Sequence, residues 1–301
     1  MIELEFRRRP ATLSYMRSAL RFRPGLGTGG RFPEIAVRWI GHRVDPRQLH
    51  EFLTLSGLAP TALQPLLYLH SVSFPLQMVI LTHRKFPVPI WRMLQVRNHL
   101  LQHRSLPADA SMDIAFRVAG QRSLEKGTEV DLLGEARAKG ELVWEGLTSF
   151  YFRGRTGAMD IASPPVQAPE PSGDLVAELR MPNHGRWRFG AITGDYNGIH
   201  LWDWYARLFG FKRALLHPQR VLGYCMERLA QGNCEGMLRL DAWLKGPVHY
   251  RSEVRLHARV SDADTTFALT TEDDARPSIL GRLRRVAPGS RLVDIAGRIA
   301  S

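Results

Sequence analysis

Three observations predict an α+β fold made of two similar halves. A stretch with four prolines in eleven residues, 163–173, divides the chain near its middle and is typical of an extended linker. Each half contains an apolar helix with a proline in its first turn, and each of these helices is followed by several strand-like runs. The repeated order of elements indicates a duplicated α+β unit.

The first half begins with a strand-like run at 34–40 and continues with the helix 74–81. This helix is almost wholly apolar, so it has to be covered on most sides. Further strands are predicted at 112–118, 129–138 and 141–152.

The second half repeats this order. A polar loop at 191–200 precedes a short helix, which we expect to begin at Asp203 as its N-cap and to end at Phe209. A longer helix begins at Pro218 and ends near Gly232, and its apolar residues recur with helical spacing. Strands are predicted at 237–244, 253–260, 265–271 and 279–286.

A curved antiparallel sheet wrapped around each apolar helix would bury it. This architecture is the hot-dog fold, and two copies in one chain make a double hot dog, with two antiparallel sheets each around a central helix. We predict an N-terminal, degenerate hot-dog domain at 1–162, the proline-rich linker at 163–173 and a C-terminal hot-dog domain at 174–301.

The composition is that of an ordinary folded protein. Hydrophobic residues make up 44% of the 301 residues, and no apolar run reaches the roughly 18 residues of a membrane span. The first residues lack the apolar stretch of a secretory signal, and two cysteines exclude a disulfide framework. We therefore expect a reducing, cytoplasmic setting.

The net charge of +12 comes mainly from arginines scattered along the chain. Arginine pairs well with phosphate and carboxylate groups. No basic run exceeds three residues and no nucleic-acid-binding motif is present, so we do not predict a nucleic-acid partner. A small ligand with phosphates or an acidic carrier protein fits this charge, as does a compositional habit of the source genome.

Two other patterns carry weaker signals. The segment 25–30 fits Gly-x-Gly-x-x-Gly, but a strand-like run follows it where a nucleotide site needs a helix, so we predict a flexible loop. His99 and His103 are four residues apart, which could place both on one helix face. The Glu that a zinc protease needs beside the first His is Leu100 here, so no metal site is predicted.

The loop 188–200 carries the most informative pattern. Asp195 and His200 are five residues apart, so a regular helix would point them in different directions. A turn over 194–198 followed by a helix start can bring them together, and Asn197 suits such a turn. A carboxylate and an imidazole that converge can hold a water and exchange protons with a substrate. The alternative is a simple Asx turn with a capping His.

This stretch resembles the hydratase-2 motif of the MaoC-like (R)-specific enoyl-CoA hydratases and dehydratases, approximately Ser/Thr-Gly-Asp-x-Asn-Pro-Ile-His and later Ala/Leu-His-Gly-Met. The resemblance covers most of 34–287, and the first half looks like the degenerate N-terminal hot dog of two-domain members. The matching residues are Thr193, Gly194, Asp195, Asn197, Ile199, His200, Ala206, Gly210, Phe211 and His217.

The resemblance implies a hydro-lyase that hydrates enoyl thioesters to (R)-3-hydroxyacyl thioesters and reverses this reaction, as part of fatty acid metabolism. Asp195 and His200 would be the catalytic pair, with Asn197 supporting the loop. The substrate-binding residues would be Gly194, Asn197, His217, Pro218 and Gln219. The substrate would be an acyl-CoA or acyl carrier protein thioester, no cofactor or metal would be needed, and the sequence is compatible with a homodimer.

Two positions depart from the family pattern. The Pro after Asn197 is Gly198 here, which should loosen the loop. The Gly after the second His, whose N–H polarises the thioester carbonyl in the family, is Pro218, and proline has no N–H. The Gln219 N–H, in the first turn of the same helix, could take its place.

Two other functions remain open from the sequence. A hot-dog acyl-CoA thioesterase would use a carboxylate to activate water for attack on the thioester carbonyl. A non-catalytic acyl-thioester-binding partner subunit is favoured by Pro218, because the loss of one such donor can lower a rate by about 10²–10³.

Overall fold

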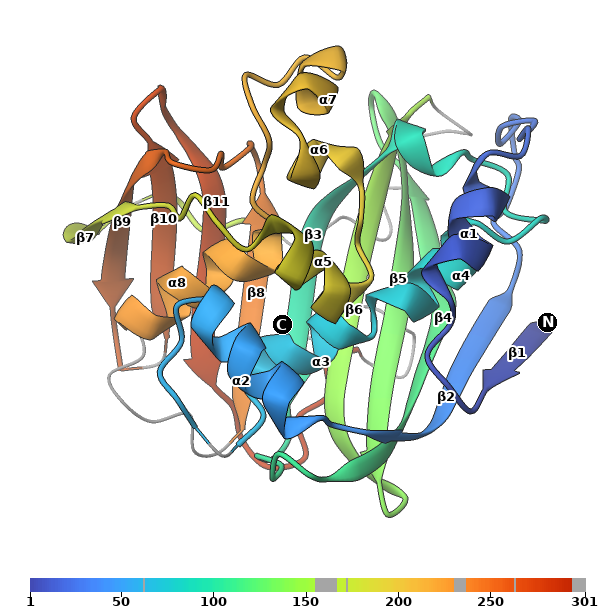
Figure 1. The fold of residues 1–301 in the computed structure, drawn as a ribbon, viewed down its shortest axis with the longest axis horizontal. Helices are drawn as coiled ribbons and strands as arrows, with labels where there is room; N and C mark the ends of the chain where they lie inside the picture. The colour runs from blue at the N-terminus through green and yellow to red at the C-terminus, as the bar shows by residue number, and fades with distance from the viewer. Residues whose placement is uncertain (62, 155–166, 172, 230–236, 263, 294–301) are drawn as a thin grey trace.

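The computed structural model describes residues 1–61, 63–154, 167–171, 173–229, 237–262 and 264–293 (Figure 1). Its strands form one sheet, in the order β1-β2-β4-β5-β6-β3-β8-β11-β10-β9-β7. Residues 163–166 and 172 of the predicted linker, the end of the long helix near Gly232 and the last residues lie outside the described part. The predicted domain bounds therefore stay a prediction.

The strand order repeats about the middle of the sheet. The first half contributes β2 (Ile35–Arg43), β3 (Met93–Gln102), β4 (Ser111–Ser123), β5 (Gly127–Ala138) and β6 (Glu141–Arg153). The second half contributes β7 (Asp174–Arg180), β8 (Leu238–Leu244), β9 (Glu253–Val260), β10 (Thr265–Thr271) and β11 (Asp274–Arg285). Reading outward from the centre, the orders β3-β6-β5-β4-β2 and β8-β11-β10-β9-β7 correspond strand for strand, as a duplicated unit requires.

The two predicted sheets are joined into one. β3 and β8 pair antiparallel, for example Leu100 with Leu240, so backbone hydrogen bonds continue across the junction of the halves. β1 (Ile2–Phe6) adds a parallel strand beyond β2 at the outer edge. Joining the halves in this way leaves fewer unpaired edge strands than two separate sheets would have.

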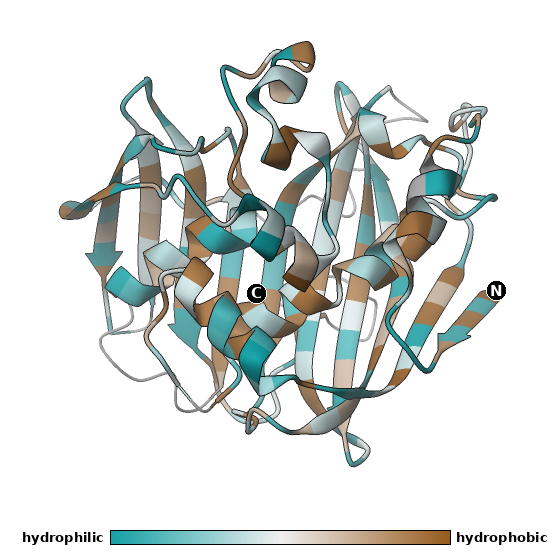
Figure 2. Cartoon of the chain, in the orientation of Figure 1, coloured by the Kyte–Doolittle hydropathy of each residue, from teal (hydrophilic) through white to brown (hydrophobic). Residues whose placement is uncertain are grey.

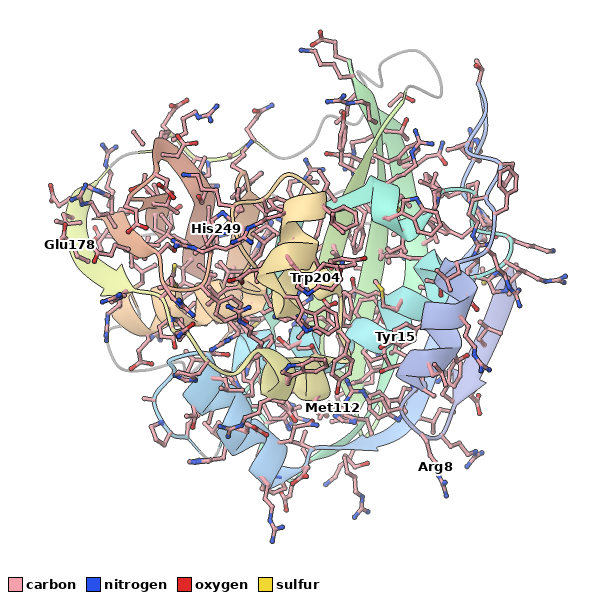
Figure 3. All side chains as sticks on the ribbon, turned by 45° about the horizontal axis from the view of Figure 1, so that its top comes forward. Arg8, Tyr15, Met112, Glu178, Trp204 and His249 are labelled. Atoms are coloured by element: carbon pink, nitrogen blue, oxygen red, sulfur yellow. The ribbon has the colours of Figure 1, made fainter. Side chains whose placement is uncertain are left out.

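The helices lie on one face of the curved sheet (Figure 1). They are α1 (Thr12–Ala19), α2 (Pro46–Leu55), α3 (Leu66–Val72), α4 (Phe74–Leu81), α5 (Arg186–Thr193), α6 (Gly198–Leu201), α7 (Asp203–Leu208) and α8 (Pro218–Leu229), with a short 3-10 turn, η1, at Ile90–Arg92. Figure 3 shows Tyr15 on α1 and Trp204 on α7 in this layer. None of the described helices is long and apolar enough to cross a membrane.

The apolar helix predicted at 74–81 is confirmed as α4, with six of its eight residues buried. α4 packs against β2 and β4, and α8 packs against β7, the strand that corresponds to β2. The hydropathy colouring in Figure 2 shows the brown apolar bands of α3 and α4 in front of the sheet. The core of the molecule therefore lies between this layer and the sheet.

The pair His99 and His103 does not share a helix face, and the expected N-cap role of Asp203 was wrong. His99 lies in β3 and His103 just after it, and the two rings bind different carboxylates, Asp241 at 2.7 Å and Glu145 at 2.9 Å. Asp203 is the first residue of α7 rather than its N-cap, because its carboxylate accepts the Ala214 N–H at 3.1 Å instead of an N–H of its own helix. In both cases the partner is distant in sequence.

Candidate active site

The loop that carries Asp195 begins at Gly194, the C-cap residue of α5. Its φ of 76° is in the left-handed region, which glycine adopts without strain. A Cβ atom here would lie 2.7 Å from Arg9 Nη2 and 2.8 Å from the Tyr15 hydroxyl oxygen. Tyr15 donates to the Gly194 carbonyl at 2.5 Å, and Arg9 Nη1 donates to the Ala191 carbonyl at 2.9 Å. These two hydrogen bonds from the N-terminal segment fix the backbone at the start of the loop.

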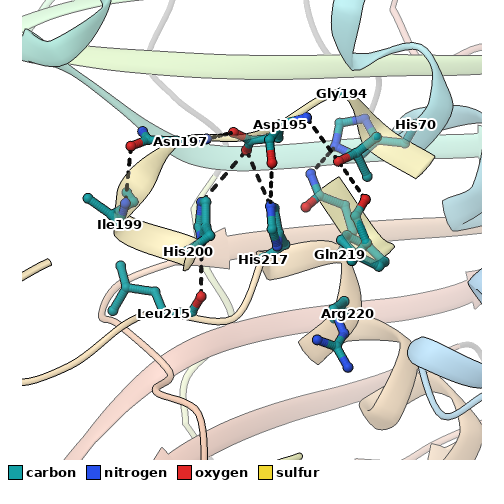
Figure 4. Close-up of polar contacts among 12 residues, drawn as sticks. His70, Gly194, Asp195, Asn197, Ile199, His200, Leu215, His217, Gln219 and Arg220 are labelled. Atoms are coloured by element: carbon teal, nitrogen blue, oxygen red, sulfur yellow. Dashed lines mark hydrogen bonds and ion pairs between the residues drawn. The ribbon is translucent and has the colours of Figure 1, made fainter. Parts of the chain in front are cut away.

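Asp195 uses its two carboxylate oxygens differently. Oδ1 accepts the Asn197 N–H at 3.0 Å, which is the Asx turn that the sequence allowed. Oδ2 lies 3.7 Å from His200 Nε2 and 3.7 Å from His217 Nε2 (Figure 4). The predicted convergence of Asp195 and His200 is found, and the turn coexists with it.

His200 is held by the helix start that the sequence predicted. Asn197 caps α6 by accepting the Ile199 N–H at 3.3 Å, which places His200 in the first turn. His200 Nδ1 lies 3.0 Å from the Leu215 carbonyl oxygen, which can only accept, so Nδ1 carries a proton. Nε2 therefore faces Asp195 as the nitrogen available for proton transfer.

His217 is a third member of the cluster. Its ring stacks on that of His200, with centroids 3.9 Å apart and planes at 22°. Its side chain is 1% exposed, and burial, followed by the neighbouring His200, holds the pKa of His217 well below its usual range. The neutral ring donates from Nε2 to the Asp195 carbonyl oxygen at 3.3 Å. His217 thus fixes the backbone of Asp195 without adding a positive charge.

Gln219 connects this cluster to the first half of the chain. Pro218 begins α8, and Gln219 follows it with a side chain that is almost fully buried. Gln219 Nε2 lies 3.3 Å from Nε2 of His70, which comes from α3. Figure 4 shows the Gln219 amide beside His217, on the side of α8 that faces Asp195.

Several supports of the site were not found from the sequence. Arg220, fully buried on α8, donates to the carbonyls of Leu55 and His184 at 2.9 and 3.1 Å and thereby ties α8 to α2. Tyr15 and His70 likewise act across the two halves. No local pattern signals such contacts, because each joins segments far apart in the chain.

Gly198 is buried at the start of α6, and a Cβ there would lie 2.6 Å from Cδ1 of Tyr205. Gly198→Ala should therefore lower the melting temperature, and it should lower turnover because His200 follows two residues later and catalytic geometry is sensitive to shifts of about 1 Å. Thermal unfolding and steady-state kinetics check this. Gly27→Ala is the matched control, since nothing lies within 4 Å of its Cβ position. Equal behaviour of the two variants would contradict it.

Because several histidines are buried as neutral rings, we expect the protein to lose stability in acid. Burial lowers the pKa of His42 and of His70 to about 4 and also lowers that of His217. In the unfolded chain these histidines take up protons near pH 6.5. Their contribution to the stability of the fold is therefore fully present above that pH and is lost as the pH falls towards 4. The largest loss in the free energy of unfolding from His42 or His70 is about 3 kcal/mol each. Equal urea midpoints at about pH 7.5 and about pH 5 would contradict this.

The residues of this cluster are also of the types that bind metal ions. The possible ligand atoms of Asp195, His200 and His217 all lie within 4.8 Å of one another, and two imidazoles with a carboxylate are a donor set that Zn²⁺ or Fe²⁺ accepts. The rings of His200 and His217 stack with their planes at 22°. His217 Nε2 is also engaged with the Asp195 carbonyl. This arrangement fits a shared water better than a metal ion.

The strand order is that of a double hot-dog fold. The Asp195–His200 geometry agrees with the resemblance of the loop to the MaoC-like hydratases and dehydratases. No family model matches the chain. In sequence it is 27% identical over 174 residues to 3-hydroxyacyl-thioester dehydratase X of Mycobacterium tuberculosis, covering 58% of this chain and 62% of that protein. It is 25% identical over 158 residues to peroxisomal enoyl-CoA hydratase 2 of Arabidopsis thaliana, covering 48% and 51%. The chain thus spans between half and two thirds of these relatives.

Solved structures share the fold over most of the chain. The crystal structure of HtdX of Mycobacterium tuberculosis matches with a TM-score of 0.70 and 21% identity, covering 83% of this chain and 100% of that one. A MaoC-like dehydratase from Phytophthora capsici matches with a TM-score of 0.70 and 16% identity, covering 85% and 96%. The predicted α+β double hot-dog fold and the resemblance to the MaoC-like hydratases and dehydratases are confirmed.

Proposed function

We propose that this chain is a hydro-lyase that hydrates trans-2-enoyl thioesters to (R)-3-hydroxyacyl thioesters and catalyses the reverse dehydration. The observation that carries the proposal is the convergence of Asp195 Oδ2 and His200 Nε2, 3.7 Å apart, on a loop that matches the hydratase-2 motif. The named relatives, a 3-hydroxyacyl-thioester dehydratase and an enoyl-CoA hydratase, support it.

Asp195 and His200 would share the proton transfers of this reaction. A water between them attacks C3 and gives one proton to Asp195 Oδ2, which is its general base. This step requires a proton on each nitrogen of His200: Nδ1–H stays with the Leu215 carbonyl, and the Nε2 proton goes to C2. The proton on Asp195 then returns to His200, and both groups regain their starting states. Since the base and the acid lie side by side, water and proton add to the same face of the double bond.

The start of α8 would stabilise the negative charge that builds up on the thioester oxygen. A helix N-terminus presents N–H groups without intrahelical partners and favours negative charge. Pro218 has no N–H to donate, and the next residue, Gln219, offers two candidate donors, its backbone N–H and its side-chain amide. The phosphates of coenzyme A or of a carrier-protein phosphopantetheine would pair with arginines at the surface. The cytoplasmic setting and the homodimer stay predictions.

Incubation with crotonyl-CoA tests the function and separates it from the two alternatives. Loss of the enoyl absorbance without release of thiol supports a hydratase. Release of free coenzyme A would identify a thioesterase, and saturable binding without any reaction would identify a non-catalytic subunit. Either of these two results contradicts the proposal.

Prolonged treatment with a chelator should leave the turnover unchanged. In the proposed mechanism each proton transfer involves Asp195 or His200, and no step needs a metal ion. The check is a comparison of kcat before and after dialysis against EDTA, with added Zn²⁺ as a second arm. Activity that disappears on dialysis and returns with metal would contradict the mechanism.

A further inference from the structure

We propose that the side-chain amide of Gln219, held by His70, donates the hydrogen bond to the thioester oxygen that Pro218 cannot donate. This inference rests on the proposed function and adds to it a catalytic group from α8 and a positioning residue from the first half. It begins from the departure at Pro218: the related motif has a glycine N–H at this position, and this chain has none.

The place of Gln219 suits this role. It is the second residue of α8 and follows His217 by two positions, and His217 Nε2 lies 3.7 Å from Asp195 Oδ2. The Gln219 side chain is 5% exposed, so a hydrogen bond from it would form away from bulk water. Donors in such a site stabilise developing charge far better than donors in water.

His70 fixes which end of the amide is available. Burial lowers the pKa of His70 to about 4, so the ring is neutral and one of its nitrogens is an acceptor. Its Nε2 faces Gln219 Nε2 at 3.3 Å and accepts one of the two N–H groups of the amide. The second N–H is left to donate. His70 Nδ1 is buried and has no partner among the described residues, so the contact with Gln219 is its one polar anchor there.

Through His70, the first half of the chain contributes a residue to the site. It lies on α3, which packs against both α5 and α8. The expected degeneracy of the first half concerns the Asp–His motif, which it lacks. On this account it still supplies a neutral acceptor that orients the amide of Gln219.

The test restores the related motif one residue at a time. Gln219→Met removes the amide at similar volume and keeps the backbone N–H, and we expect kcat to fall by about 10²-fold with a small change in KM. Pro218→Gly should keep or raise turnover. The double variant Pro218→Gly with Gln219→Met recreates His-Gly-Met, and we expect its kcat within about tenfold of the original, because the glycine N–H replaces the amide.

A merely structural role for Gln219 would not show this rescue, because a glycine at position 218 does not strengthen the start of α8. Gln64→Met is the matched control for the loss of a buried amide, since Gln64 donates to the Pro107 carbonyl away from the site. It should lower stability without lowering kcat. His70→Phe should reduce kcat as Gln219→Met does, and the two changes combined should be no worse than either alone.

The results separate this inference from the proposed function. If the unmodified protein hydrates crotonyl-CoA and Gln219→Met matches its kcat, the inference is wrong and the proposed function stands. A loss in Gln219→Met that the glycine at 218 does not rescue, in a variant that folds, also overturns it. If the unmodified protein does not hydrate any enoyl thioester, the proposed function fails and this inference fails with it.

Discussion

Replacing Asp195 by Asn should lower kcat for hydration by about 10²–10⁴-fold while the fold is retained, the range that general acid–base catalysis contributes. The amide keeps the shape of the carboxylate, and its oxygen can still accept the Asn197 N–H that forms the turn. It cannot take a proton from water. The measurement is steady-state kinetics on crotonyl-CoA together with circular dichroism and thermal unfolding.

Asp45→Asn is the matched control for this change. Asp45 caps α2 and accepts the Arg47 N–H at 2.9 Å, the same kind of local turn that Asp195 forms with Asn197, but it does not lie at the cluster. It should keep full turnover. Near-normal kcat in Asp195→Asn, on any substrate that the original protein hydrates, would remove Asp195 from the mechanism.

Trp144→Ala should produce the largest loss of stability, about 3–5 kcal/mol in the free energy of unfolding, the range for large aromatic residues in a core. The Trp144 side chain on β6 is 1% exposed, and its Nε1 donates to the Leu66 carbonyl at 3.1 Å. Leu66 begins α3, the helix that carries His70. The change would leave a cavity and release the start of this helix, so turnover should fall as well.

Urea unfolding of Trp144→Ala, Trp144→Phe and Trp91→Ala separates the contributions. Trp144→Phe keeps most of the ring and loses the hydrogen bond, so it should cost about 1 kcal/mol more than its change in volume explains. Trp91 is 54% exposed, and its replacement should change stability by less than about 0.5 kcal/mol. Equal effects at Trp144 and Trp91 would contradict the proposed packing of α3 on the sheet.

Much of the fold was predictable because its signals are local. Strand alternation, the apolar helix 74–81 and the proline at position 218 each lie within a short window, and the structure places β9 at Glu253–Val260 and β10 at Thr265–Thr271, where they were expected. The junction of the halves was not predictable in this way. It depends on β3 pairing with β8, which lie more than a hundred residues apart.

In the site too, the features formed by residues close in sequence were predictable, and those formed by distant segments were not. Asp195, Asn197 and His200 lie within six residues, so their turn could be derived from residue types and spacing. The stacking of His217 on His200 and the contact of Gln219 with His70 depend on how α6, α8 and α3 pack together. The prediction that Gly198 loosens the loop considered only the missing proline, whereas the Tyr205 ring fills the space beside it.

The central claim is that this chain adds water to an enoyl thioester with the base and the acid on one face of the double bond. The most direct test is hydration of crotonyl-CoA in D₂O, followed by analysis of the chirality of the product at C3 and of the deuterium at C2. We predict (R)-3-hydroxybutyryl-CoA with a single deuterium at C2, added on the same face as the hydroxyl group. An (S) product, deuterium on the opposite face, or free coenzyme A would contradict the account.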